Sequence, residues 1–242
     1  MRTIYNPTVV IGATSAIGSE ICSTLRLRDP SIKLYLTGNS RRDSVREYPN
    51  STWFKLDVTD HINTKYFIEQ VAKESKNVFN IVYCAGVLAD KPICDIELST
   101  WKETYAVNVE GAFAVIQAAY RPLALGGKGR IVAVTSVASR RPRTGQAAYS
   151  SSKAALNLLI RTAAIELGRF GITCNLVMPG AVAEGMLEGA PEAMLMHMKN
   201  STPLRSLSTS TDVASAVAFL LGDDAKQISG QELVIDGGYL TA

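Results

Sequence analysis

The pair Tyr149 and Lys153 carries the chemistry that this sequence offers most clearly. The two residues stand four positions apart at the start of a segment with helical periodicity, so their side chains share one helical face. A free phenol titrates near pH ~10, too high for easy proton exchange at neutral pH. A neighbouring ammonium favours the phenolate and lowers that pKa. Tyr149 is therefore a candidate general acid, with Lys153 as its activator.

A third polar group, Ser136, lies thirteen residues before Tyr149, directly after the predicted strand Arg130–Thr135. In a parallel sheet the active groups collect outside the carboxyl ends of the strands. A serine that ends a strand is more often an ordinary turn residue, but its combination with the Tyr149 and Lys153 pair is much rarer than its parts. We expect Ser136 to contact the substrate.

A glycine-bearing turn follows the first predicted strand and leads directly into a helix. Its residues are Gly12, Ala13, Thr14, Ser15, Ala16, Ile17 and Gly18. Such a turn lets the backbone approach a pyrophosphate, and the N-terminus of the helix offers free N–H groups and the positive end of the dipole. Glycine turns after strands are common, and this spacing is not GxGxxG. Its position on the first strand of an alternating α/β chain makes it a predicted dinucleotide site.

The residues after the second predicted strand indicate which dinucleotide binds. They are Gly38, Asn39, Ser40, Arg41 and Arg42, with no carboxylate before Asp43. An NAD site usually has an acidic residue here for the ribose 2′-hydroxyl. Asn39, Ser40 and Arg41 instead offer donors to a 2′-phosphate. The sequence therefore predicts NADP(H), although a basic cluster is often only a solvated loop.

Short β-branched runs alternate with longer segments of helical periodicity along the whole chain. The predicted strands are Thr8–Ile11, Lys33–Thr37, Thr52–Leu56, Ile81–Cys84, Arg130–Thr135, Thr173–Val177 and Glu232–Ile235. The predicted helices are Ile17–Arg28, His61–Glu74, Trp101–Tyr120, Tyr149–Phe170 and Thr211–Leu221. Apolar strands separated by helices favour a parallel sheet covered on both faces. We expect one doubly wound, Rossmann-type α/β domain over residues 1–242, with a sheet of about seven strands.

Composition excludes several classes of function. The chain has 242 residues, 47% of them hydrophobic, a net charge of +3, four cysteines and two histidines. The mild charge argues against nucleic acid as the main ligand, and no apolar run could span a bilayer. We expect no signal peptide, no metal site, and four reduced, buried thiols in the cytoplasm.

On these motifs the chain resembles the short-chain dehydrogenase/reductase family, from its first strand to Asp236, Gly237 and Gly238. The likeness rests on Gly12, Ile17, Gly18, Leu56, Asp57, Val58, Thr59, Ala85, Gly86, Asn108, Ser136, Tyr149, Lys153, Asn175, Pro179 and Gly180. The resemblance implies that Tyr149 protonates a carbonyl oxygen to which Ser136 hydrogen-bonds. It also implies that the protein is a homo-oligomer, either a tetramer or a dimer.

The resemblance assigns further residues to the cofactor. Lys153 would hold the nicotinamide ribose and lower the pKa of Tyr149, and Asn108 would hold a water that relays protons to Lys153. The remaining cofactor contacts implied are Asp57 and Val58 beside the adenine, Ala85 and Gly86 at the ribose with Cys84 next to them, and Pro179, Gly180 and Val182 beside the nicotinamide.

Three departures from the family pattern concern cofactor geometry. Ala16 replaces a usual glycine and adds a methyl group near the pyrophosphate. Tyr83 and Cys84 replace two asparagines, so the bonds that brace this strand must be made otherwise. Glu184 replaces a threonine that commonly helps to hold the nicotinamide, and phosphates would repel its carboxylate. We expect Glu184 to point away.

Two features bear on the substrate. In the family, residues 181–206 form a lid, and here they contain Met186, Met194, Met196 and Met198. Flexible thioethers suit an acyl chain, although a helix packed on its own domain or on another subunit would explain them equally well. Arg140, Arg141 and Arg143 lie between Ser136 and Tyr149, where they would favour an anionic partner.

Within the family the chain looks most like 3-oxoacyl-[acyl-carrier-protein] reductases, which implies a carrier-bound 3-oxoacyl thioester and an acidic acyl carrier protein. Phe170, next to Arg169, departs from a carrier-binding arginine. One alternative is a reductase or dehydrogenase of another small ketone or alcohol in secondary metabolism. Another, of a different class, is a non-catalytic NADP-binding regulator, which would typically have lost Ser136, Tyr149 or Lys153.

Overall fold

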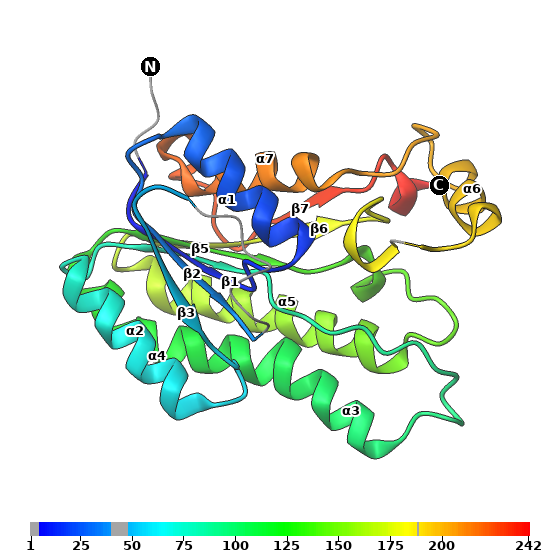
Figure 1. The fold of residues 1–242 in the computed structure, drawn as a ribbon, viewed down its shortest axis with the longest axis horizontal. Coiled ribbons are helices and arrows are strands. Elements are labelled where there is room, and N and C mark those ends of the chain that lie inside the picture. Colours follow the sequence, from blue (N-terminus) through cyan, green and yellow to red (C-terminus); the bar gives the residue numbers. More distant parts are fainter. Residues whose placement is uncertain (1–4, 40–47, 188) are drawn as a thin grey trace.

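The strands of the chain form one parallel sheet in the order β3-β2-β1-β4-β5-β6-β7 (Figure 1). The computed structural model describes residues 5–39, 48–187 and 189–242. Its strands are β1 (Thr8–Ile11), β2 (Leu34–Gly38), β3 (Ser51–Lys55), β4 (Asn80–Tyr83), β5 (Gly129–Val134), β6 (Ile172–Pro179) and β7 (Glu232–Ile235). Its α-helices are α1 (Ala16–Arg28), α2 (His61–Glu74), α3 (Leu98–Tyr105), α4 (Gly111–Gly126), α5 (Ala147–Gly168), α6 (Glu192–Asn200) and α7 (Ser210–Leu221).

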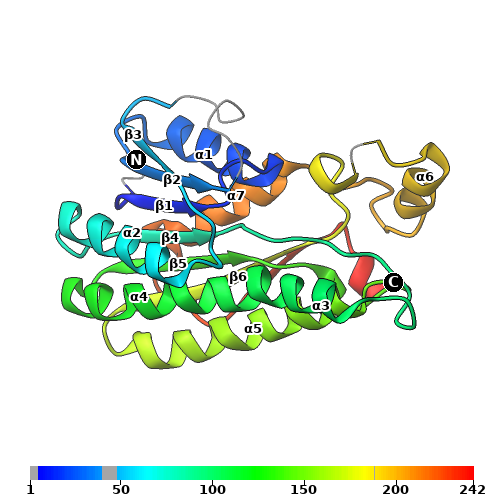
Figure 2. The same cartoon turned by 60° about the horizontal axis from the view of Figure 1, so that its bottom comes forward.

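Alternation along the strands divides the core into two layers. In β1, Val9 and Ile11 pack toward the layer of α2, α4 and α5, whereas Val10 packs toward α1 and α7. Figures 1 and 2 show these two helical layers on opposite faces of the sheet. Because both faces are covered, the central strands are apolar throughout. The predicted doubly wound α/β fold with seven parallel strands is confirmed.

The prediction of one continuous helix over Trp101–Tyr120 is wrong. The chain instead forms α3, a π-helical segment at Ala106–Glu110, and α4. The N–H of Gly111 donates to the carbonyl of Ala106, five residues back. The apolar periodicity of a sequence hardly changes when one turn widens, so the pattern did not reveal the segment.

The strand order creates the crevice in which a ligand of this fold binds. From β1 the chain runs outward to β2 and β3 and then returns to β4 on the other side of β1. Loops that leave the carboxyl ends of β1 and β4 therefore diverge, and a crevice opens between them. Beyond the same edge of the sheet, the segment between β6 and α7 carries α6 away from the body of the domain (Figure 2).

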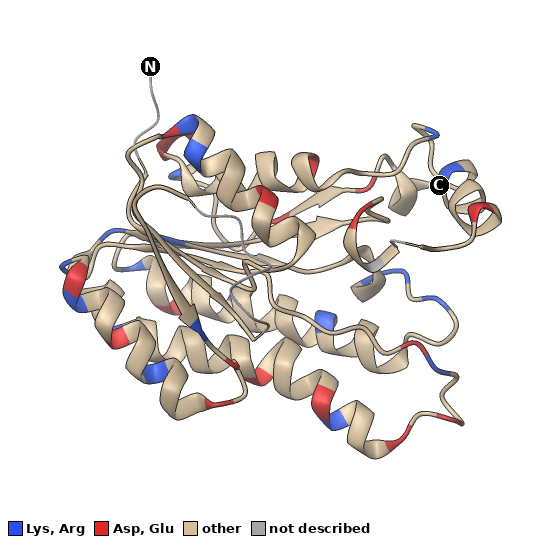
Figure 3. Cartoon of the chain, in the orientation of Figure 1, with Lys and Arg blue, Asp and Glu red and all other residues tan. Residues whose placement is uncertain are grey.

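Charged residues of both signs are interspersed over the two helical layers, and the strands are mostly uncharged (Figure 3). None of the helices in the described ranges is long and apolar enough to cross a membrane. All four cysteines are free thiols. The prediction that all of them are buried is wrong for Cys94, which is exposed in the loop before α3, and Cys84 is only half-buried.

Candidate active site

The side chains of Ser136, Tyr149 and Lys153 border one cavity of about 240 Å³ at the carboxyl edge of the sheet. Ser136 lies two residues after the end of β5, and Tyr149 and Lys153 lie in the first two turns of α5. Both α5 residues are buried. Strand β5 and helix α5 therefore bring two hydroxyl groups and an amine to the same cavity wall, as the spacing of these residues predicts.

The electrostatics of Tyr149 differ from the expectation that Lys153 lowers its pKa. Burial raises the pKa of Tyr149, and the carboxylate of Asp90 adds to this effect. A hydrogen bond from Ser136 and the positive charge of Arg143 act in the opposite direction. The Nζ of Lys153 lies 5.7 Å from the centre of the Tyr149 ring. In the protein alone, Ser136 and Arg143 are the groups that favour the phenolate.

Lys153 is itself shifted toward its neutral form. Burial lowers its pKa to about 8, while its interaction with Cys84 works slightly the other way. Its Nζ donates a hydrogen bond to the carbonyl of Val134, 3.2 Å away, at the end of β5. The ammonium is thus held at the carboxyl edge of the sheet, between the β5 backbone and the residues that follow β4.

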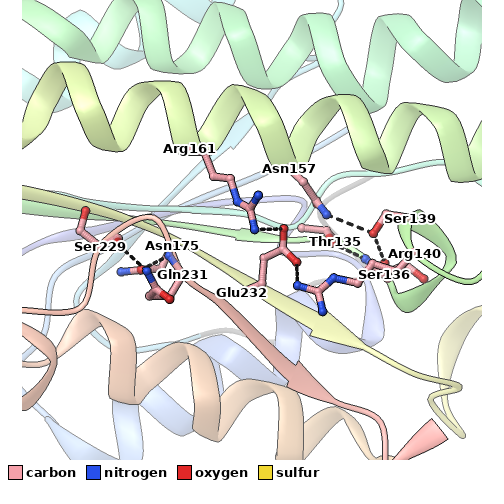
Figure 4. Close-up of polar contacts among 10 residues, drawn as sticks. All are labelled: Thr135, Ser136, Ser139, Arg140, Asn157, Arg161, Asn175, Ser229, Gln231 and Glu232. Carbon is pink, nitrogen blue, oxygen red and sulfur yellow. Dashed lines mark hydrogen bonds and ion pairs between the residues drawn. The ribbon is translucent and has the colours of Figure 1, made fainter. Parts of the chain in front are cut away.

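The loop that carries Ser136 is fixed by a series of hydrogen bonds from α5 (Figure 4). Asn157 donates through Nδ2 to the Ser139 hydroxyl at 3.1 Å, and that hydroxyl donates to the carbonyl of Ser136 at 2.7 Å. The Ser136 hydroxyl accepts from the N–H of Ala138 at 3.1 Å. Its own hydrogen is shared with Tyr149 in the protein alone and can be donated to a substrate oxygen instead.

An ion-pair cluster holds the next residue of this loop. Arg140 pairs with Glu232 at the start of β7, and Arg161 of α5 contacts the same carboxylate at 2.9 Å (Figure 4). The Glu232 side chain is only 5% exposed. Just before it, Gln231 donates its N–H to the Oδ1 of Asn175 at 3.1 Å. The prediction that Arg140 faces an anionic partner is therefore wrong, because Glu232 already neutralises it.

The other two arginines of this loop border the cavity but differ in their bonding. Arg141 donates to the carbonyl of Tyr239 at 2.6 Å and to an Ala242 oxygen at 2.9 Å, and its guanidinium stacks on the Tyr239 ring at 4.5 Å. It fixes the segment after β7. Arg143 has no carboxylate partner among the described residues, so it alone of the three fits the predicted role.

Asn108 lies in the π-helical segment and braces the loop after β4. Its Oδ1 accepts from the N–H of Val87 at 2.9 Å, and its Nδ2 donates to the carbonyl of Val87 and to the Ser152 hydroxyl. A side-chain carbon at Gly86 would lie 3.1 Å from the Nζ of Lys153 and 3.3 Å from the Oδ1 of Asn108. Asn108 and Lys153 therefore meet at Gly86, as their predicted roles require.

Tyr83 and Cys84 supply the bracing that the missing asparagines would give. The hydroxyl of Tyr83 donates to the carbonyl of Val107 at 2.5 Å and so ties β4 to the π-helical segment. The Sγ of Cys84 lies 3.6 Å from the hydroxyl of Ser15 in the glycine-bearing turn. Burial raises the pKa of the Cys84 thiol, so the group stays neutral and acts as a contact between β4 and the turn.

The turn between β1 and α1 fits the pyrophosphate of a dinucleotide. Gly12 has φ +86°, and a side-chain carbon there would lie 2.7 Å from the backbone nitrogen of Ala85. Ser15 caps α1 by accepting from the N–H of Gly18 at 3.0 Å. Ser15, Ala16 and Ile17 border the cavity. Backbone N–H groups at the start of a helix suit an anion, so the donor set and the glycine cradle match the expected cofactor.

The adenosine end of the expected cofactor site has a hydrogen bond between Asn39 and Asp57. The Nδ2 of Asn39 donates to Asp57 at 2.9 Å. Bonds from the hydroxyl and N–H of Thr59 hold the pKa of Asp57 below its usual range, despite partial burial. Val58 is buried beside it, and Thr14 packs against Gly38. Ser40 and Arg41, also predicted to bind the cofactor, lie outside the described residues.

The other wall of the cavity comes from the end of β6 and the segment after it. Pro179, Gly180 and Val182 border the cavity as expected. Glu184 also borders it, but its carboxylate accepts from the N–H of Ser210 at 2.9 Å and from its hydroxyl. The carboxylate thus caps the N-terminus of α7, where a negative charge is stabilised. This explains how the site accommodates Glu184.

The predicted methionine lid agrees with the structure only in part. Met198 is buried and borders the cavity with Leu187, whereas Met194 and Met196 are exposed on α6. The prediction that these two form an apolar wall for the substrate is wrong, because both side chains are exposed and neither borders the cavity. The side chain of Met186 lies outside the described residues.

Some residues of the site were not predicted from the sequence. Gln146, His197 and Tyr239 border the cavity, and Asn157 and Glu232 fix the Ser136 loop. Gln146 precedes Tyr149 by three residues, a spacing that could have revealed it. Glu232 could not be found in this way, because its partner Arg140 lies 92 residues away in the sequence.

The chain is similar in sequence and fold to known proteins. A family described as enoyl-(acyl carrier protein) reductase matches residues 12–240. A (3R)-3-hydroxyacyl-CoA dehydrogenase from Rattus norvegicus is 34% identical over 244 residues, covering 95% of this chain and 94% of the relative. A cyclopentanol dehydrogenase from Comamonas testosteroni is 30% identical over 244 residues and 97% of each chain. A crystal structure of a putative gluconate dehydrogenase from Agrobacterium tumefaciens shares the fold with a TM-score of 0.92, at 22% identity and over 98% of this chain and 96% of its own.

Proposed function

The chain belongs to the short-chain dehydrogenase/reductase family, and we propose that it reduces 3-oxoacyl thioesters to their 3-hydroxyacyl forms with NADPH. It is an NAD(P)-dependent oxidoreductase that acts on hydroxyl or carbonyl groups. The observation that carries the proposal is that Ser136, Tyr149 and Lys153 line one cavity together with apolar side chains such as Leu187 and Met198. An acyl chain suits the apolar side, and its ketone suits the hydroxyl groups.

The residues divide the reduction between them. A nicotinamide cofactor, when bound, would supply a hydride for the carbonyl carbon. Tyr149 gives its phenolic proton to the carbonyl oxygen, so that an alcohol forms, and Ser136 donates a hydrogen bond to the same oxygen. Lys153 would hold the cofactor ribose and return a proton toward the phenolate. Asn108 fixes the loop around Gly86 against which Lys153 lies, and in this proposal it also holds the relay water.

The cofactor assignment rests on the residues around the adenine ribose. Gly38 and Asn39 present no carboxylate at the end of β2, and Ser40, Arg41 and Arg42 follow them in the sequence. A guanidinium pairs well with a 2′-phosphate. Asp57 engages the amide of Asn39, so in this proposal the phosphate is held mainly by residues 40–42.

The thioester assignment draws on the relatives and on Arg143. The Rattus norvegicus relative is a 3-hydroxyacyl-CoA dehydrogenase. Arg143 borders the cavity, where it can meet a phosphate on the arm of an acyl carrier protein or of coenzyme A. Since Arg140 and Arg141 have partners within the chain, the charge argument for the acidic carrier protein now depends on Arg143.

The test is NADPH consumption at matched concentrations of acyl carrier protein thioesters, coenzyme A thioesters, cyclic ketones, steroids and sugars. We expect a 3-oxoacyl thioester to have the highest kcat/KM. A higher value for a small cyclic ketone would replace the proposal with an alicyclic alcohol dehydrogenase, as in the Comamonas relative. No oxidation with any ketone would indicate the non-catalytic regulator.

Two further proposals concern the setting of the enzyme. We propose a homo-oligomer, supported by the exposed apolar side chains of Phe113 on α4 and of Leu158 and Ile165 on α5. Sedimentation velocity would test this, since a monomer at micromolar concentration contradicts it.

We also place the protein in the cytoplasm, where its four free thiols stay reduced.

A further inference from the structure

The carboxamide of Gln146 is a buried polar group for which the fold provides no partner. Gln146 is 4% exposed, and its Oε1 has no hydrogen-bond partner within the described part of the chain. It occupies the N-cap position of α5, yet its side chain makes no capping bond. A buried, unsatisfied amide costs free energy of folding. Its presence is explained if the amide binds a ligand.

The position of Gln146 indicates which ligand its amide would bind. Its side chain borders the same cavity as Ser136 and Tyr149. Its backbone is fixed, because its N–H donates to the backbone carbonyl of Arg143 at 3.1 Å and its carbonyl accepts from the N–H of Ser150 at 2.8 Å. Residues three apart at a helix have Cβ atoms roughly 5–6 Å from each other on one face. The side chains of Gln146 and Tyr149 therefore start from neighbouring positions on the cavity wall.

The chemistry of the amide limits the kinds of ligand group that it would bind. A carboxamide is uncharged and carries both a donor and an acceptor, so it suits a neutral polar group rather than an anion. Within the described residues no side-chain hydrogen bond holds it, so a half-turn that puts Nε2 in the place of the unpaired Oε1 breaks none. A 3-oxoacyl thioester has a second carbonyl one methylene away from the ketone. A simple ketone has no such group.

We propose that Gln146 is a specificity-determining residue that donates a hydrogen bond to the thioester carbonyl while Ser136 and Tyr149 hold the ketone oxygen. The inference rests on the proposed function and deepens it. It makes the enzyme selective for ketones that carry a second carbonyl at the β position. Arg143, at the edge of the same cavity, is left for the charged part of the substrate.

The experiment compares the wild type with Gln146→Met, which keeps the length of the side chain and removes its hydrogen-bonding groups. The substrates are an N-acetylcysteamine 3-oxobutanoyl thioester, ethyl 3-oxobutanoate and 2-hexanone, which lacks the second carbonyl. We expect kcat/KM to fall about tenfold for both dicarbonyls and less than about twofold for 2-hexanone. The melting temperature should not fall, because an unsatisfied buried amide is replaced by an apolar group.

Ser150→Ala is the matched control. The Ser150 hydroxyl is also buried without a partner among the described residues, but it does not border the cavity. All three activities should stay unchanged in this variant. The same comparison in Gln146→Asn, whose amide is one methylene shorter, should show partial loss for the dicarbonyls only.

The outcomes separate the inference from the proposed function. Equal losses on the dicarbonyls and on 2-hexanone would overturn the inference, because Gln146 would then act through Tyr149. No loss on any substrate would also overturn it. If the thioester is not reduced but the ester is, and only the ester suffers from the substitution, the inference stands and the thioester assignment fails. If the wild type reduces neither dicarbonyl, the inference is wrong.

Discussion

The Nζ of Lys153 donates to the backbone carbonyl of Val134 at 3.2 Å, so the amine of α5 is anchored on the strand that leads to Ser136. This bond places the charge of Lys153 at the carboxyl edge of the sheet, where the expected cofactor ribose lies. Burial opposes the charge at this place and lowers the pKa of Lys153 to about 8. The site therefore contains a group that changes its charge in an accessible pH range.

Activity should depend on this titration. Below pH of about 8 Lys153 is charged, and above it the neutral amine predominates, so kcat/KM for reduction should fall as the pH rises through that value. In Lys153→Arg the falling limb should disappear from the measurable range, at lower overall activity, because a guanidinium stays charged. The measurement is a pH profile of kcat/KM. Lys91→Arg, at an exposed position, is the control and should keep the limb. An unchanged limb in Lys153→Arg would assign it to another group.

Replacing Tyr149 by Phe should remove the proton donor and leave the cofactor site intact. We expect turnover to fall on the order of a hundredfold or more. Quenching of protein fluorescence by NADPH should show nearly unchanged binding, because the phosphate-binding turn lies elsewhere in the fold. Near-normal turnover would falsify the role of Tyr149.

Cofactor choice should respond to Asn39. The wild type should use NADPH at least about tenfold better than NADH, by kcat/KM, if residues 40–42 hold a 2′-phosphate. Asn39→Asp adds a carboxylate beside Asp57, which would repel that phosphate and accept from a 2′-hydroxyl, so the preference should erode or reverse. Asn39→Ala, which adds no charge, separates repulsion from the loss of the amide. Equal or better use of NADH by the wild type would contradict the cofactor assignment.

Arg143 and Arg140 should differ when each is replaced by Ala. Arg143→Ala should raise the KM for a carrier-bound or coenzyme A thioester by several-fold, an effect that shrinks as salt rises. The kcat for a small uncharged ketone should change little. Arg140→Ala should instead lower the melting temperature, because it leaves Glu232 with only Arg161. If Arg143→Ala slows both substrates alike, its role is structural.

Replacing Glu232 by Gln should loosen the loop that carries Ser136. The carboxylate is buried but both arginines are about half exposed, so we expect a loss of about 1–2 kcal/mol in the free energy of unfolding. Urea denaturation measures it. Asp223→Asn is the matched control, since this carboxylate is 93% exposed and lies 3.8 Å from Arg130; it should have no measurable effect. Equal effects of both variants would show that the cluster does not hold the loop.

The sequence predicted those features that depend on neighbours along the chain. Short β-branched, apolar runs located every strand of the described sheet to within one or two residues. The spacing of Tyr149 and Lys153, together with the strand end at Ser136, predicted that the three would meet. These predictions hold because a helical turn and a parallel strand end fix geometry locally.

Contacts between distant segments could not be predicted in this way. The sequence around Arg140 looks like a basic loop, and only the fold brings Glu232 beside it. Glu184 looks like a repelled carboxylate until Ser210 is seen to donate to it. The methionines of the lid look equivalent, although the orientation of α6 buries Met198 alone among the three that are described.

The π-helical segment Ala106–Glu110 makes the length of the chain critical at this point. Each residue turns a helix by about 100°, so losing or gaining one residue here would rotate α4 relative to α3. The side of α4 that contains Val115 and Leu123 would then leave the core, or Asn108 would leave Val87. Substitutions at the exposed Glu110 can be absorbed. The deletion of one residue cannot be absorbed. The position of Asn108 in the active site therefore depends on the number of residues in the widened turn that contains it.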